Sequence, residues 1–124
     1  MDSSEKMTID SFEKELLKAE KILNTEFSFD LAEPSYLSCL EIITNNAHLK
    51  SKFESSIINL FDSKKLSDEP VAYLMFKLRW SGVKSWAEAK LGTLENPAIE
   101  GDSLQKVLDA FCDDWDNQDF YRFI

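Results

Sequence analysis

The stretch 70–92 most constrains what this chain can fold into, because its first half is apolar on nearly every side. Four of its side chains share the i, i+3, i+4 and i+7 spacing of one helix face, namely Val71, Leu74, Met75 and Leu78. Tyr73 and Phe76 lie off that face, so this helix must be covered on more than one side. We therefore predict a central helix. The side chains expected to be nearly inaccessible to solvent are Leu74, Met75, Leu78 and Trp80.

Weaker helical spacing continues beyond this helix and elsewhere in the chain. A second helix is predicted to end at Gly92, joined to the first at Ser81 and Gly82. Gly82 is expected to take the positive φ that many helix ends require. Pro34 suits the first turn of a helix, and the segment 25–30 before it is predicted to be a link. Periodic apolar positions place the remaining helices at about 8–24, 33–46, 49–61 and 102–111.

Glycine and proline are scarce, which favours helices with short connections over a β fold. The 124 residues include three Gly and three Pro, and 44% of them are apolar. A chain of this length can bury one sufficient core without metal or disulfides. We predict a compact, single-domain all-α fold of six or seven short, mostly antiparallel helices over residues 8–124, after a frayed N-terminus at 1–7. The pairs within 33–61 and 70–92 resemble, by analogy, the helix pairs of HEAT-type solenoids.

Negative charge is concentrated toward the C-terminus. The net charge is −9, and residues 93–124 hold eight acidic and two basic side chains. Such a field repels nucleic-acid backbones and anionic membranes and attracts basic partners. The N-terminus does not resemble a signal peptide, and no window approaches the roughly 20 apolar residues of a membrane span. We expect a cytoplasmic protein that binds neither nucleic acid nor membrane.

Motifs for catalysis or metal binding are not found in the sequence. His48 is the single histidine, and Cys39 and Cys112 are too far apart to form a metal-ligand motif, so both are expected to be buried, reduced thiols. The acidic run 113–119 has the alternating carboxylates of a calcium loop, but Asp119 occupies the position that requires Gly. We therefore predict no catalytic residue, no metal site, no cofactor and no enzymatic activity.

Aromatic side chains interrupt the acidic run near the C-terminus. Aromatic anchors surrounded by charge are typical of protein interfaces. The residues predicted to face a partner are Asp113, Asp114, Trp115, Asp116, Asp119 and Tyr121. Two alternatives remain open at this point. The run can be a solvated helix end, and Trp115, Phe120 and Phe123 can hold the C-terminus to the core.

Two segments resemble a known group of proteins. KLRWSGVKSWAEA at 77–89 and FCDDWDNQDFYRFI at 111–124 are similar to segments of small bacterial immunity proteins of contact-dependent growth inhibition and related polymorphic toxin systems. The resemblance covers about 70–124. It implies a small, acidic, cytoplasmic protein that binds one toxin domain tightly, often a basic nuclease. It also implies a structural role for Arg79 and Trp80 and a partner-facing role for the acidic run.

The leading functional hypothesis is therefore an immunity protein that neutralises a basic cytotoxic domain, such as a nuclease, by occlusion. The alternative is a helical adaptor or regulatory module that binds a basic peptide or subunit in a groove between helices. Binding partners distinguish the two hypotheses, because an adaptor has no toxin partner.

Overall fold

The computed structural model describes residues 3–124, apart from the side chain of Glu100, and those residues form helices and connecting turns without a strand. This confirms the predicted all-α fold. Seven α-helices and two 3₁₀ helices follow in the order α1 Ser3–Glu26, α2 Phe29–Asn45, η1 Ala47–Leu49, α3 Lys50–Asp62, α4 Asp68–Leu78, α5 Ser81–Gly92, α6 Pro97–Glu100, α7 Asp102–Asp109 and η2 Asp116–Phe120.

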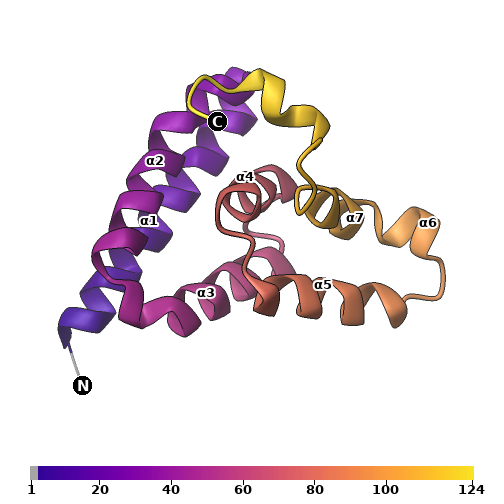
Figure 1. Cartoon of the computed structure of the whole chain (residues 1–124), viewed down its shortest axis with the longest axis horizontal. Coiled ribbons are helices and arrows are strands. Elements are labelled where there is room, and N and C mark those ends of the chain that lie inside the picture. The colour runs from indigo at the N-terminus through magenta and orange to yellow at the C-terminus, as the bar shows by residue number, and fades with distance from the viewer. Residues whose placement is uncertain (1–2) are drawn as a thin grey trace.

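The helices surround α4, which is seen end-on near the middle of Figure 1. α1 and α2 form a long antiparallel pair on one side, and α3 and α5 run along a second side. α7 packs against both α4 and α5. α2 and α3, and likewise α4 and α5, diverge from the turns that connect them (Figure 1), so these sequential pairs do not lie side by side as HEAT-type pairs do.

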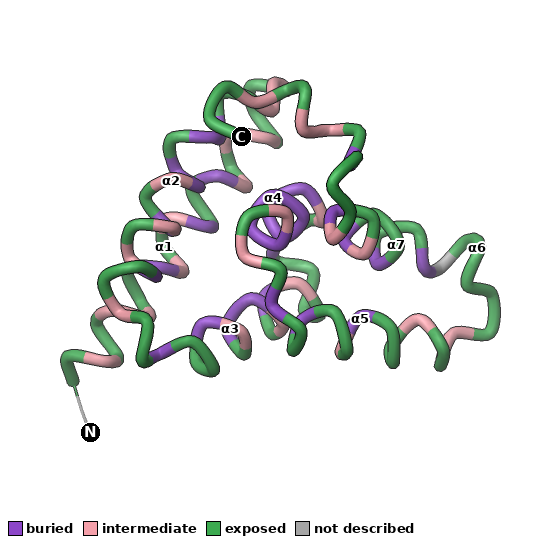
Figure 2. Tube along the Cα trace, in the orientation of Figure 1, coloured by how far each residue is buried: buried purple, intermediate pink, exposed green. Residues whose placement is uncertain are grey.

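The central position of α4 is confirmed by its burial. Five consecutive residues, 71–75, are all buried, and buried positions run along most of this helix in Figure 2. Consecutive burial means that neighbouring segments cover the helix on every side. Trp80 is also buried, but Leu78 is only partly buried. The prediction for Leu78 was therefore wrong, because Leu78 lies in the last turn of α4, where the cover ends.

Both helices of the N-terminal pair start earlier than predicted. α1 begins at Ser3, so residues 3–7, predicted to be frayed, are helical. An ion pair between Glu5 and Lys52 of α3 ties this first turn to the rest of the protein. α2 begins at Phe29 and contains Pro34 within it, so most of the predicted link 25–30 is helical. A proline here removes one helical hydrogen bond, and its exposed position leaves the opposite, buried face of α2 intact.

The positive φ between α4 and α5 belongs to Arg79 rather than Gly82. Arg79 has a φ of 53° and ends α4, while Gly82 lies inside α5. A non-glycine residue rarely adopts this region. A Cβ at Gly82 would meet the carboxylate of Glu54 on α3, the end of a flexible side chain that can move aside. The predicted positive φ at Gly82 was wrong.

Candidate functional site

The C-terminal segment, residues 110–124, crosses from α7 back to the turn between α1 and α2 (Figure 1). It contains all six residues predicted to face a partner. Its path is determined by two buried carboxylates of the helices beneath it, Glu33 of α2 and Glu69 of α4.

Glu33 is 2% exposed and accepts three hydrogen bonds. Its Oε1 accepts from the backbone N–H of Arg122 at 2.8 Å, and its Oε2 accepts from the backbone N–H of Phe123 at 3.1 Å. The Tyr73 hydroxyl of α4 donates to the same Oε2 at 2.7 Å. A buried carboxylate is tolerated only when its oxygens are satisfied in this way. Glu33 thus joins α2, α4 and the end of the chain.

Glu69 holds the preceding part of the C-terminal segment. Its Oε1 accepts from Asn117 Nδ2 at 2.8 Å, and its Oε2 accepts from the Tyr121 hydroxyl. Burial raises the pKa of the Glu69 carboxyl, because a low-dielectric environment disfavours the charge, while hydrogen bonds from Tyr121 and Asn117 act in the opposite direction. Both buried carboxylates are therefore engaged in holding the segment.

Three tyrosine rings fill the space between these carboxylates. Tyr36 lies 4.5 Å from Tyr73, and Tyr121 lies 4.7 Å from Tyr73, measured between ring centroids. Burial raises the pKa of all three hydroxyls. The Tyr36 hydroxyl is buried and makes no well-formed hydrogen bond among residues 3–124, although it lies near the Tyr121 hydroxyl. The cluster is therefore nearly, but not completely, satisfied.

Two of the predicted partner-facing residues point into the protein. Trp115 is 5% exposed, and its ring centroid lies 5.2 Å from that of Phe76 on α4. Tyr121 is half-buried by the contacts described above. The alternative in which aromatic residues hold the C-terminus to the core is therefore correct for Trp115. Phe120 makes only an edge contact with Phe29 of α2, and both Phe120 and Phe123 are more than half exposed.

The four predicted aspartates lie on the surface. Asp113, Asp114, Asp116 and Asp119 are all exposed. Asp113 Oδ1 accepts a hydrogen bond from Arg79 Nη2 at 2.7 Å, and its side chain is 95% exposed. No ion pair of the other three aspartates occurs among residues 3–124. The aspartates lie on the loop that follows α7 and on the 3₁₀ helix η2, where all four face solvent.

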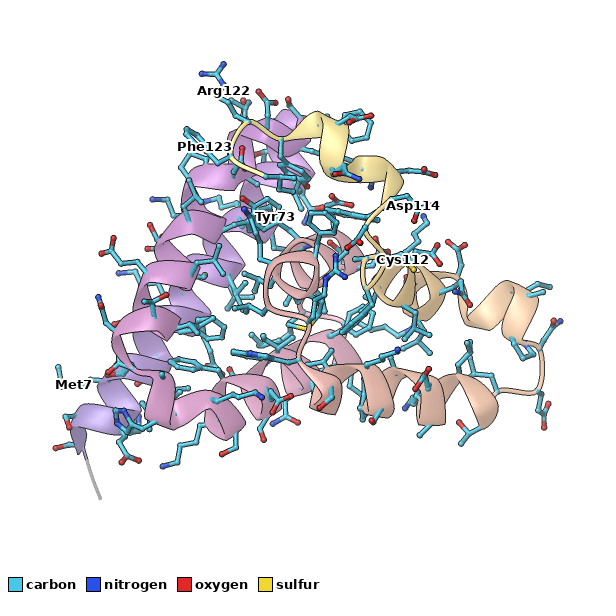
Figure 3. The ribbon with its side chains drawn as sticks, in the orientation of Figure 1. Met7, Tyr73, Cys112, Asp114, Arg122 and Phe123 are labelled. Carbon is cyan, nitrogen blue, oxygen red and sulfur yellow. The ribbon has the colours of Figure 1, made fainter. Side chains whose placement is uncertain are left out.

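Exposed apolar side chains gather at the end of the molecule where the C-terminal segment meets the α1–α2 turn. We call this group the apolar end patch; it consists of Phe27, Phe120, Phe123 and Ile124. The exposed Leu31 lies instead on the outer face of α2 with Pro34. Figure 3 labels Phe123 at this end, and Met7 at the opposite end of α1. The rings of Phe29 and Phe120 meet edge-on with centroids 5.2 Å apart, which brings the start of α2 against the C-terminal segment.

Glu33 and Glu69 were not among the predicted functional residues, although the sequence contains a signal for both. Apolar or aromatic residues stand three, four and seven positions after each glutamate, so each glutamate lies within the apolar face of its helix. An acidic residue at such a position indicates a buried carboxylate with partners. The exposed Phe27 and Leu31 have no comparable signal, because an apolar residue gives no local indication that it is uncovered.

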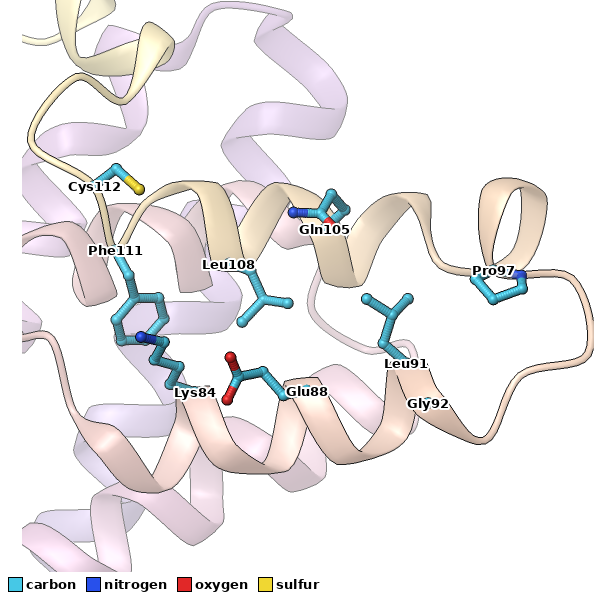
Figure 4. Close-up of a pocket in the computed structure, with 9 residues that line it drawn as sticks. All are labelled: Lys84, Glu88, Leu91, Gly92, Pro97, Gln105, Leu108, Phe111 and Cys112. Atoms are coloured by element: carbon cyan, nitrogen blue, oxygen red, sulfur yellow. The ribbon is translucent and has the colours of Figure 1, made fainter.

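A separate groove of about 620 Å³ lies between α5 and α7. Leu91 and Leu108 face one another across it in Figure 4, with Lys84 and Glu88 along the α5 side. Cys112 lies at its rim and is exposed, so the predicted burial of this thiol was wrong, whereas Cys39 is buried as predicted. Burial raises the pKa of the Cys39 thiol to about 12. The groove is lined by mixed charges and carries no cluster of ionisable groups.

Within residues 3–124, no group of three or more His, Cys, Asp or Glu side chains is arranged to hold a metal ion. The helices of the same residues include none with the length and apolar character needed to cross a bilayer. Comparisons with protein families, curated proteins and solved structures found no match. The fold and the site define the protein as an all-α protein that exposes an acidic segment supported by hydrogen bonds to two buried glutamates.

Proposed function

We propose that this protein is an immunity protein that binds a basic cytotoxic domain, such as a nuclease, and neutralises it by occlusion in the bacterial cytoplasm. It acts without a cofactor and without turnover. One observation carries the proposal. The exposed aspartates at 113, 114, 116 and 119 belong to a segment whose backbone and side chains are held by two buried glutamates.

Ordering of the acidic segment before binding lowers the entropy cost of forming a complex. A mobile acidic tail would lose conformational freedom when a partner orders it, and that loss subtracts from affinity. Hydrogen bonds from Arg122, Phe123 and Asn117 to the buried carboxylates remove much of this cost before binding. A preorganised acidic surface supports rapid and tight association with a basic domain. The resemblance of 77–89 and 111–124 to immunity proteins supports the same function.

Growth rescue tests the proposal. The proposal predicts that a neighbouring gene encodes a toxin domain. That domain should stop growth when expressed alone, and co-expression of the wild-type protein should restore growth. Continued killing in the presence of abundant, folded protein would contradict the proposal. A matched pair of variants adds a position test. Both remove four negative charges, one by Asp→Asn at 113, 114, 116 and 119, the other by Glu→Gln at 15, 41, 88 and 95. Only the first should reduce rescue.

The groove between α5 and α7 favours the second candidate, a helical adaptor that binds a basic peptide. Its apolar lining includes Leu91 and Leu108 on opposite sides, and the Glu88 carboxylate can bind a basic side chain. An adaptor should recover a partner from the cytosol of its own cell that is not a toxin. Leu108→Lys should abolish that interaction, whereas the fourfold Asp→Asn variant should retain it. The opposite pattern favours the immunity protein.

A further inference from the structure

We infer that the apolar end patch is the surface that anchors a basic protein partner, in the role that the sequence analysis assigned to Trp115. This inference rests on the proposed function for the nature of the partner. The patch joins two segments that are remote in sequence, with Phe27 in the α1–α2 turn and Phe120, Phe123 and Ile124 at the end of the chain, brought together by the contact between Phe29 and Phe120.

Phe27 is the most informative member of the patch. Its side chain is 85% exposed, and its φ is 54° in the short turn between α1 and α2. A bulky L-residue is disfavoured in this left-handed region, where Gly or Asn is usual. A phenylalanine at this position therefore stabilises the folded protein neither by burying its ring nor by favouring the backbone conformation. A contact made only in a complex accounts for the choice.

The other aromatic members are held in place from within the protein. Phe120 rests edge-on against the Phe29 ring at 5.2 Å. The backbone of Phe123 donates to Glu33 at 3.1 Å and accepts from Lys77 Nζ at 2.7 Å. The Phe120 and Phe123 side chains are exposed above this support. Anchors that are ordered before binding lose little entropy in the complex.

The charge around the patch specifies the partner. Exposed carboxylates of Glu26 and Asp30 lie beside the α1–α2 turn, and those of Asp116 and Asp119 lie on η2. Two cations lie beside the patch, Arg122 and Lys77, whose Nζ donates to the Phe123 carbonyl, so the four carboxylates outnumber them. An apolar centre with an acidic rim complements an apolar surface bordered by Lys and Arg. A second copy of this chain would instead place two acidic rims against each other, which disfavours self-association.

Isolated exposed apolar residues are ordinary on protein surfaces. Met7 and Ile99 are of that kind here, at 69% and 74% exposed, and neither belongs to the patch. They provide matched controls, because they expose comparable apolar area at other places on the same protein.

The first test maps binding with a defined probe. A short amphipathic helical peptide of Leu and Lys is titrated into ¹⁵N-labelled protein at low salt, with a Leu and Glu peptide as the control. We expect amide shifts confined to 26–31 and 116–124 with the Lys peptide and none with the Glu peptide. Shifts centred on the α5–α7 groove, or no shifts, would overturn the inference. Dimerisation in sedimentation that Phe27→Gly abolishes would assign the patch to a second copy and overturn it too.

The second test separates anchoring from folding. Phe27→Gly removes the ring and relieves the backbone, so its melting temperature should equal or exceed that of the wild type, while its affinity for the Lys peptide falls about tenfold, the loss expected of an interface anchor. Phe123→Ser retains its backbone hydrogen bonds and should weaken binding similarly. Met7→Ser and Ile99→Ser should bind as the wild type does. Equal losses in all four variants would overturn the inference.

Failure of this inference and failure of the proposed function give different results. If the Lys peptide binds at the patch but the wild-type protein does not rescue growth, the patch is an interface and the toxin hypothesis is wrong. If Phe27→Gly and Phe123→Ser rescue growth as fully as the wild type, the function stands and the anchor lies elsewhere.

Discussion

Two sets of carboxylates lie at the C-terminal segment. One set is buried and holds the segment in place, and the other is exposed to solvent. Glu33 and Glu69 lie beneath the segment, are buried, and accept five hydrogen bonds between them. The aspartates of the segment itself are exposed, and only Asp113 has an ion pair within residues 3–124. The buried pair determines structure because unsatisfied polar groups are costly in the interior. The exposed set can act on a partner because its charges are not yet neutralised.

The largest effect is expected from Glu33→Ala. This change leaves the Tyr73 hydroxyl and the backbone N–H groups of Arg122 and Phe123 without their acceptor. The free energy of unfolding should fall by about 3–5 kcal/mol, because each buried unpaired donor carries a desolvation cost. Urea denaturation followed by circular dichroism measures it. A loss below about 1 kcal/mol, the value expected for an exposed carboxylate, would remove the distinction between the two sets.

Two tyrosines beside the buried carboxylates should respond in opposite directions to the loss of one oxygen. Tyr73→Phe removes a hydrogen bond to the Glu33 carboxylate and should lower stability by about 1.5–3 kcal/mol. Tyr36→Phe removes a buried hydroxyl that makes no well-formed hydrogen bond within residues 3–124, and it should raise stability by about 1 kcal/mol. The same denaturation measurement compares both variants. Losses of the same sign and size would show that the Tyr36 hydroxyl is satisfied in solution.

A smaller effect, visible as a pH dependence, should come from Glu69→Gln. Burial raises the folded-state pKa of this carboxyl above 4.5, so protonation favours the folded state. Its contribution to stability is complete below pH 4.5 and is lost as the pH rises through the folded-state pKa. The wild type should therefore gain stability relative to Glu69→Gln as the pH falls from neutral toward 4.5. Exposed Glu88→Gln is the control, and its curve should run parallel to that of the wild type.

The smallest effect on stability is expected from Asp→Asn at 113, 114, 116 and 119 together. The single ion pair lost, between Asp113 and Arg79, is largely exposed, so the free energy of unfolding should change by less than about 1 kcal/mol. Association with a basic partner should slow and lose much of its salt dependence, because long-range attraction acts on encounter. Stopped-flow rates at two salt concentrations measure this. Rates and salt slopes equal to the wild type would show that the exposed set has no role in binding.

Local patterns were sufficient to predict much of the fold. The apolar circumference of 71–76 predicted a covered, central helix, and α4 occupies that position. Local residue types also stand at the helix starts, with Ser67 directly before α4 and Asn96 directly before Pro97 of α6. These features depend on residues within one or two helical turns of each other. Helical spacing and end signals are local properties, so the sequence reports them directly.

Start positions were less accurate where a distant contact extends a helix. Pro34 is a strong local signal for the start of a helix, yet α2 begins five residues earlier, at Phe29. The end of the chain contacts this extension, since Phe120 meets Phe29 and the Arg122 backbone N–H donates to Glu33 from 89 positions away. No local signal specifies such a contact.

By itself the sequence determined the all-α fold, the buried central helix and the concentration of acidic side chains near the C-terminus. Only the tertiary structure decided which aromatic residues of 113–124 are covered. Trp115 meets Phe76 and Tyr121 reaches Glu69, while Phe120 and Phe123 remain outside. The segment has no sustained helical period, so no local rule separates inward from outward positions. Each side chain there is buried or exposed according to what α2 and α4 place opposite it, and that is set by the path of the whole chain.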